Sequence, residues 1–223
     1  MLAGLLHPTT GKVTVNGVDV SEKTDEAKHM RHKVGMVFQY PEHQLFEETI
    51  AEDIAFGPKN LGLDAEEVDR RVREAMAFVG LDYDTYAERS PFHLSGGQMR
   101  RVAIAGVVAM EPDFLVLDEP SAGLDPFGRE EIFDEIIKLH KEKDVTVILV
   151  SHNMEDISRM ANRLIVLDKG QIVLDGKPLD IFNHHRHVLQ QVGVDVPPVS
   201  VLIESLRNRG LDVSNEVLTV DDA

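Results

Sequence analysis

Apolar residues recur at helical spacing through the first half of the chain. Residues 65–79 show the pattern most clearly, because their apolar positions fall on one face of a helix with 3.6 residues per turn. These positions are Val68, Val72, Ala75, Met76 and Val79. Asp64 before the segment and Gly80 after it are residue types that cap helices. Similar patterns predict helices over residues 24–32, 49–63, 82–89 and 99–105.

Continuous apolar runs predict buried strands over residues 34–38, 114–117 and 145–150. A helix is expected over residues 127–143, between the last two runs. Strand, helix and strand in this order make a βαβ unit, whose two strands run parallel with a right-handed crossover. The expected fold class is therefore α/β, with a parallel sheet and a mainly helical region, residues 40–110, inserted between its strands.

Two hairpins are expected at dipeptides that reverse the chain. Asn16-Gly17 interrupts an alternating stretch, and Lys169-Gly170 separates two short apolar runs. Residues 1–6 have the composition of the last turn of an apolar helix, which Pro8 would end. Pro197-Pro198 marks a boundary before an amphipathic helix around residues 201–206.

Composition and charge narrow the class of protein. The 223 residues suffice for one sizeable domain, or one domain with a small appendage. With 39 acidic and 23 basic residues, the net charge of −16 argues against a nucleic-acid partner. The sequence has no cysteine, no run of about 18 apolar residues and no signal peptide. An intracellular protein is expected, whose role at a membrane would come through a partner.

The stretch Leu-Ser-Gly-Gly-Gln at residues 94–98 is a candidate phosphate site. Ser95 stands where a helix N-cap would, and its hydroxyl can accept a bond from the first turn. Gly96 and Gly97 lack a Cβ atom, so another molecule can approach the backbone closely. Free N–H groups and the positive end of the helix dipole suit an oxyanion. Taken alone, the stretch predicts only a capped helix.

Asp118-Glu119 directly follows a buried strand and is a second candidate. A carboxylate at a strand end can hold Mg²⁺ opposite the phosphates of a nucleotide. A neighbouring carboxylate can orient or deprotonate an attacking water. The plain alternative is an acidic turn after a strand. Asp125 could simply cap the next helix, His152 could be a solvated loop histidine, and Gln39 is uninformative by itself.

Together these elements resemble, in order and spacing, the ATP-binding cassette ATPase family. Residues 94–98 match its signature sequence, and residues 114–119 match its Walker B strand with the catalytic glutamate. Gln39 matches the Q-loop glutamine, residues 121–125 match the D-loop, and His152 matches the switch histidine. The resemblance implies a P-loop-type α/β core with a parallel sheet, an inserted helical subdomain and a short C-terminal extension.

The resemblance is closer to the ATP-binding subunits of energy-coupling factor importers. The matching segments lie at residues 38–46, 55–60, 99–107, 193–197 and 218–220. Such subunits dimerise, with a copy of themselves or with a sister ATPase, on the cytoplasmic face of the membrane. They act beneath a transmembrane scaffold subunit, while a separate membrane subunit captures a vitamin or a transition-metal ion. The expected segments are 1–39 (core remnant), 40–110 (signature subdomain), 111–179 (core) and 180–223 (C-terminal extension).

The same resemblance assigns roles to residues and implies ATP and Mg²⁺ as ligands. Asp118 and Gln39 would hold the metal. The residues assigned to catalysis are Glu119, His152 and Asp125. Those assigned to ATP on the facing subunit are Ser95, Gly96, Gly97 and Gln98.

One element of the family pattern is absent from the sequence. No Gly-x-x-x-x-Gly-Lys-Ser/Thr loop, whose amides and lysine hold the β- and γ-phosphates, occurs in the 223 residues. The expectation is that the sequence begins before or within the helix following that loop, without the first strands. As given, the chain would complete a partner's ATP site through residues 95–98 but would lack its own phosphate cradle.

The sequence is also compatible with two other functions. A non-catalytic subunit that completes another subunit's ATP site is compatible with the missing loop. A soluble cassette ATPase of DNA repair or translation fits less well with the acidic balance and the segment from 38 to 56. His184, His185 and His187 could bind a metal, but a solvated helical tract is the favoured interpretation.

Overall fold

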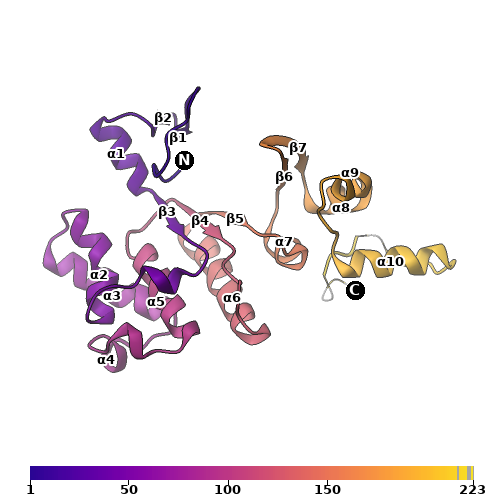
Figure 1. Cartoon of the computed structure of the whole chain (residues 1–223). Helices are drawn as coiled ribbons and strands as arrows, with labels where there is room; N and C mark the ends of the chain where they lie inside the picture. Colours follow the sequence, from indigo (N-terminus) through magenta and orange to yellow (C-terminus); the bar gives the residue numbers. More distant parts are fainter. Residues whose placement is uncertain (215, 220–221, 223) are drawn as a thin grey trace. The chain divides into compact units, whose positions relative to one another are not determined.

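A computed structural model describes residues 1–214, 216–219 and 222 of the chain. The chain divides into two compact units, Met1–Val150 and Ser151–Ala223 (Figure 1). The division into four segments expected from the sequence stays a prediction. Val220, in the last of the matching tail segments, lies outside the described residues.

The first unit is built on a parallel sheet of three strands in the order β3-β4-β5. These strands are β3 (Val34–Val37), β4 (Phe114–Asp118) and β5 (Thr146–Val150). The long helix α6 (Pro126–Lys143) connects β4 to β5. Leu115 and Leu117 of the middle strand are fully buried. The expected βαβ unit and the α/β class are confirmed.

The helical region lies between β3 and β4 in sequence. It comprises α2 (Ile50–Asn60), α3 (Ala65–Phe78), α4 (Tyr83–Tyr86) and α5 (Gly96–Val108), with short 3-10 turns η1 (Pro41–Gln44) and η2 (Pro91–His93). Each α-helix starts at a side-chain cap that accepts a backbone N–H bond; the caps are Thr49, Asp64, Asp82 and Ser95. Helices α2, α3 and α5 pack against one another, as Figure 1 shows. The expected helices are confirmed.

A small antiparallel hairpin precedes this core. It pairs β1 (Thr14–Val15) with β2 (Val18–Asp19), and α1 (Asp25–His32) follows it. Asn16 and Gly17 both have positive φ, 49° and 83°, which is the conformation that a type I′ turn requires. The hairpin expected at this dipeptide is confirmed.

The helical turn expected over residues 1–6 is wrong. The segment forms a turn and bends, with the Gly4 N–H donating to the Met1 carbonyl at 2.8 Å. Gly4 has a φ of +74°, which a right-handed helix does not accommodate.

The second unit is described by itself. It contains α7 (Met154–Met160), the antiparallel pair β6 (Leu164–Asp168) and β7 (Gln171–Gly176), and helices α8 (Pro178–His184), α9 (Arg186–Gln191) and α10 (Pro198–Asn208). Its apolar centre consists of Met154, Ile157, Val166, Ile181, Phe182 and Leu189. Lys169 and Gly170 both have positive φ, so the expected hairpin is confirmed. In neither unit is a described helix long and apolar enough to cross a membrane.

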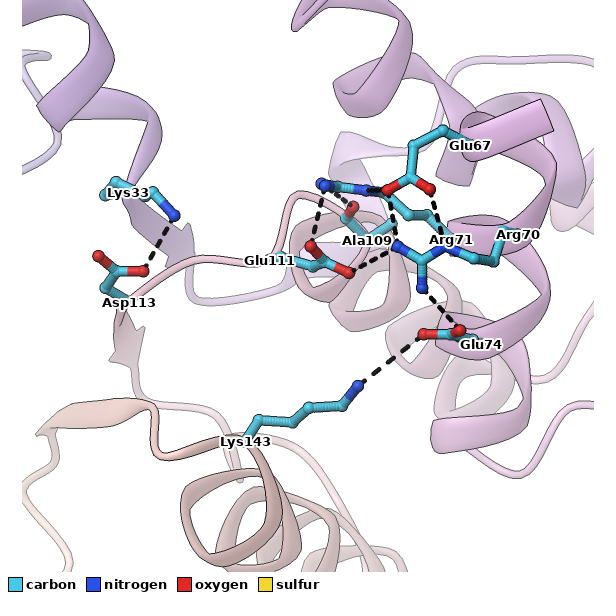
Figure 2. A network of polar contacts seen from close by, with 9 residues as sticks. All are labelled: Lys33, Glu67, Arg70, Arg71, Glu74, Ala109, Glu111, Asp113 and Lys143. Atoms are coloured by element: carbon cyan, nitrogen blue, oxygen red, sulfur yellow. Dashed lines mark hydrogen bonds and ion pairs between the residues drawn. The ribbon is translucent and has the colours of Figure 1, made fainter. Parts of the chain in front are cut away.

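A network of ion pairs joins α3 to the connection between α5 and β4 (Figure 2). The carboxylate of Glu111, in that connection, forms ion pairs with Arg70 at 3.2 Å and with Arg71 at 2.8 Å. Hydrogen bonds from the same two arginines lower the pKa of Glu67 to about 2. Lys33 and Asp113, at the starts of β3 and β4, pair at 3.1 Å. The network borders a cavity of about 590 Å³ at the amino ends of the strands.

A second polar link joins α5 to α6. Arg101 of α5 pairs with Glu131 and lies 3.9 Å from Glu135, both on α6. The Oε2 atom of Glu135 is buried and has no hydrogen-bond partner among the described residues. Burial raises the pKa of Glu135 from 4.5 to about 7, opposed by Arg101 and reinforced by Glu131.

This pKa makes the stability of the fold depend on pH. Glu135 binds its proton more tightly in the folded state, so the free energy of unfolding should fall as pH rises from 4.5 to about 7. The amide in Glu135→Gln cannot titrate. The free energy of unfolding of this variant should therefore fall by about 1 kcal/mol less than that of the wild type over this pH window, a small difference because partial exposure screens the charge. Urea unfolding at pH 5 and pH 8 measures the difference.

Glu130→Gln, an exposed position on the same helix, is the matched control and should retain the wild-type pH dependence. Identical pH dependence in the wild type and Glu135→Gln would contradict the assignment.

Candidate functional site

Three of the candidate residues lie at the carboxyl ends of the strands in the parallel sheet. Val37 pairs with Leu117, so Gln39 and Asp118 both come within two residues of this pair. Asp118 is the last residue of β4 and is partly buried, while Gln39 is exposed. Open α/β sheets bind ligands outside the carboxyl ends of their strands. The structure thus brings Gln39, Asp118 and Glu119 to the edge where a ligand would bind.

Glu119 begins a tight turn directly after β4. Its φ is 49°, in the left-handed region that non-glycine residues rarely occupy. Its N–H donates to the Val150 carbonyl at 2.9 Å, and its own carbonyl accepts the Ala122 N–H at 3.1 Å. Such backbone strain persists only where the surroundings hold it, and it concentrates at functional sites.

The start of α5 is capped by its own side chains. The Gln98 N–H donates to Ser95 Oγ at 3.3 Å, and the Ser95 N–H donates to Gln98 Oε1 at 3.1 Å. This reciprocal pair is a capping box, so the expected N-cap is confirmed. Gly96 and Gly97 are exposed, and a Cβ atom built on either meets nothing within 4 Å. Packing within the chain therefore does not require glycine at these positions.

Asp125 caps α6 in the same way. Its Oδ1 accepts the Gly128 N–H at 2.7 Å, and Pro126 occupies the first helical position. The structural role considered for Asp125 is thus present. Its D-loop role stays a prediction.

His152 lies in the second unit, two residues after β5 in sequence. It is exposed and borders a cavity of about 630 Å³ within that unit. Asn153 beside it caps α7 through two backbone N–H groups. The grouping of His152 with Asp118 and Glu119 stays a prediction of the sequence.

One buried residue in this region was not among the sequence candidates. Arg100 of α5 is 3% exposed, and its guanidinium reaches the turn that follows Glu119. The available signal was its position on the apolar face of the helix, three and four residues before Ala103 and Ile104. A buried arginine must find hydrogen-bond acceptors, so this placement indicates a specific contact.

The histidines near residue 185 do not form a metal site. Among the described residues, no group of three or more His, Asp or Glu side chains could hold a metal ion. His184 ends α8, whereas His187 lies in α9. This division favours the solvated alternative.

A parallel sheet with Asp-Glu at the end of its middle strand, and a capped glycine-rich helix start, define an α/β ATPase of the cassette type. The family described as ABC transporter matches residues 1–122, slightly more than half of the chain. The chain belongs to this ATPase family.

Three known proteins illustrate what the chain is similar to. The energy-coupling factor transporter ATP-binding protein EcfA2 of Clostridium perfringens is 54% identical over 100% of this chain and 78% of its own length. The structure of cbiO1 from the same species, part of the ABC transporter complex cbiONQ, has 32% identity and a TM-score of 0.73. That match covers 91% of this chain and 80% of cbiO1.

The third is an ATP-binding cassette solved as a dimer in a post-hydrolysis state with ADP and Pi. It has 29% identity and a TM-score of 0.67, and the match covers 78% of this chain and 76% of that one. Both structural comparisons agree with the fold class expected from the sequence.

The conformation of Glu119 gives a direct test of backbone strain. Glycine adopts positive φ freely, so Glu119→Gly should be more stable than Glu119→Ala by about 1 kcal/mol. At Glu130, inside α6, the order should reverse by a similar amount, because alanine favours the helix. Urea unfolding of the four variants checks both orders. Equal stabilities of the two Glu119 variants would rule out strain at this residue.

Proposed function

We propose that this chain is an ATP-hydrolysing subunit that energises an energy-coupling factor importer of vitamins or transition-metal ions. One observation carries the proposal. Two carboxylates at the end of β4 and a solvent-exposed glycine pair at the start of α5 occur together in this chain. The chain is 54% identical, along all of its residues, to an energy-coupling factor ATP-binding protein. The chain works as a dimer with a copy of itself or a sister ATPase.

The start of α5 serves the nucleotide of the facing subunit. Gly96 and Gly97 are open to solvent, and the capping box fixes the helix start without covering its outer face. Ser95 and Gln98 hold this geometry, and the exposed N–H groups stabilise charge on the phosphates. The openness of this surface supports an approach by another molecule.

Residues at the carboxyl ends of β3 and β4 carry out hydrolysis. Asp118 and Gln39 offer a carboxylate and an amide oxygen at neighbouring strand ends, a donor set that suits Mg²⁺. A bound Mg²⁺ would neutralise phosphate charge at this edge. Glu119 polarises the attacking water, and the turn holds its backbone in one conformation. Asp125 communicates across the dimer and His152 contacts the γ-phosphate.

An exposed aromatic surface beside Gln39 supports docking of a membrane scaffold subunit. Its members are Phe38, Tyr40, Phe46 and Phe56. Phe46 and Phe56 contact edge to face with ring centroids 4.8 Å apart. The carboxylate of Asp53 accepts the Phe46 N–H at 2.8 Å and fixes the loop. Adjacent exposed aromatic groups commonly mark interaction sites, and this supports the proposal of a peripheral subunit at the cytoplasmic face of the membrane.

Glu119→Gln tests the catalytic role. The amide cannot act as a base, so ATP hydrolysis by the assembled complex should fall by about 10²- to 10⁴-fold while ATP still binds. Single-turnover hydrolysis and nucleotide retention measure the two effects. Unchanged hydrolysis would refute the role of Glu119.

Gly97→Ala tests the role of α5 in the facing site. The added methyl group meets open space, so the free energy of unfolding should stay the same or rise by up to about 1 kcal/mol. ATP hydrolysis by the dimer should nevertheless fall at least about 100-fold, because the methyl group obstructs the phosphates. Gly106→Ala, the same change farther along α5, is the control and should keep full activity.

Glu119→Gln and Gly97→Ala together distinguish an ATP-hydrolysing chain from a non-catalytic partner. Loss of activity in both indicates that the chain hydrolyses ATP. Loss in Gly97→Ala alone indicates that the chain only completes the site of a sister ATPase. Full activity in Gly97→Ala would exclude both functions for α5.

A further inference from the structure

We infer that Arg100 is a positioning residue that locks the signature helix α5 to the turn carrying Glu119, and so links the two ATP half-sites to which one chain contributes. The inference rests on the proposed function for its consequence in catalysis. The lock itself rests on contacts within the first unit.

The guanidinium of Arg100 bonds to two backbone carbonyls of the turn. Its Nη1 donates to the Pro120 carbonyl at 2.8 Å, and its Nη2 donates to the Ala122 carbonyl at 3.0 Å. The planar guanidinium presents its donors in a fixed fork, whereas the ammonium of lysine is a single point of attachment. Two carbonyls on either side of Ser121 therefore suit arginine and fix the course of the turn.

A third contact connects Arg100 to the segment that follows Gln39. Its Nη2 lies 3.5 Å from Oε2 of Glu42, which belongs to the 3-10 turn η1. One side chain of the signature helix thus contacts both the turn after β4 and the turn after β3. These are the three segments that carry the proposed ATP contacts of the first unit.

The burial of Arg100 argues for a specific role. The side chain is 3% exposed, and its Nε has no hydrogen-bond partner among the described residues. Removing a charge from water is costly, and an apolar side chain of similar size would often be at least as stabilising. The contacts of Arg100 with two carbonyls give directional positioning that an apolar residue cannot supply.

The location of Arg100 allows it to transmit position. It stands one helical turn after Gly96, so α5 cannot shift or rotate at its start without moving the guanidinium. At its other end, the guanidinium grips the carbonyl of Pro120, the residue next to Glu119. The N–H of Glu119 is already fixed on Val150. Arg100 therefore fixes the position of the start of α5 relative to Glu119.

The neighbouring Arg101 shows that this role is particular to Arg100. Arg101 contacts the side chains of Glu131 and Glu135 on α6, whereas Arg100 bonds to the backbone of the turn. Its contacts join two helices, whereas those of Arg100 join the motif-bearing segments.

Hydrogen exchange on the full chain tests the lock without requiring ATP hydrolysis. In Arg100→Gln, the amides of Ala122 and Leu124, which bond within the turn, should exchange at least tenfold faster. The amides of Leu115 and Leu117 in β4 should keep their protection. Arg100→Lys should lie between Arg100→Gln and the wild type, and Arg73→Gln, at an exposed ion pair on α3, should match the wild type.

Hydrolysis by the assembled importer complex gives the second readout. Arg100→Gln should lower kcat at least tenfold and change KM less than threefold, with Arg100→Lys recovering part of kcat. If Arg100→Gln does not fold, the same comparison between Arg100→Lys and the wild type decides. Unchanged exchange in the turn overturns the lock. Faster exchange with unchanged kcat overturns the link to catalysis, and an inactive wild-type complex overturns only the proposed function.

Discussion

Strand β4 has a parallel neighbour on each edge, and this double pairing is the constraint on which the first unit depends. Its residues from Phe114 to Leu117 pair with β3, and those from Phe114 to Asp118 pair with β5. Leu115 and Leu117 are fully buried, and a slip by one residue would exchange the side chains that β4 presents to the two covered faces of the sheet. The end of β4 is consequently fixed, and Asp118 and Glu119 take their positions from it.

Local sequence signals predicted most of the elements. Ser95 and Gln98 stand three residues apart at the start of α5, and this spacing is itself the capping box. Asn16-Gly17 supplied the two positive φ angles that the first hairpin needs. The apolar run before Asp118 identified the middle strand, because a strand covered on both faces has no reason to alternate.

Long-range and conformational features could not be predicted in this way. The contacts of Arg100 join residues 20 and 22 positions apart, and no periodicity encodes which carbonyls an arginine will meet. Glu119 combines its positive φ with a bond to Val150, and that bond exists only once β5 has joined the sheet. The turn at residues 1–6 differs from the expected helix because apolar composition says nothing about available bonding partners.

The ion pairs around Glu111 divide the first unit into regions that respond differently to the solvent. The arginines and carboxylates of this network, drawn in Figure 2, lie at the amino ends of the strands. Their side chains are in part exposed. Dissolved salt screens such pairs, whereas the apolar contacts among α2, α3 and α5 are insensitive to screening. Ionic strength therefore acts on the joint between α3 and β4 selectively. Salt would weaken this joint while the interior of the helical region and the buried contacts of Arg100 stay intact.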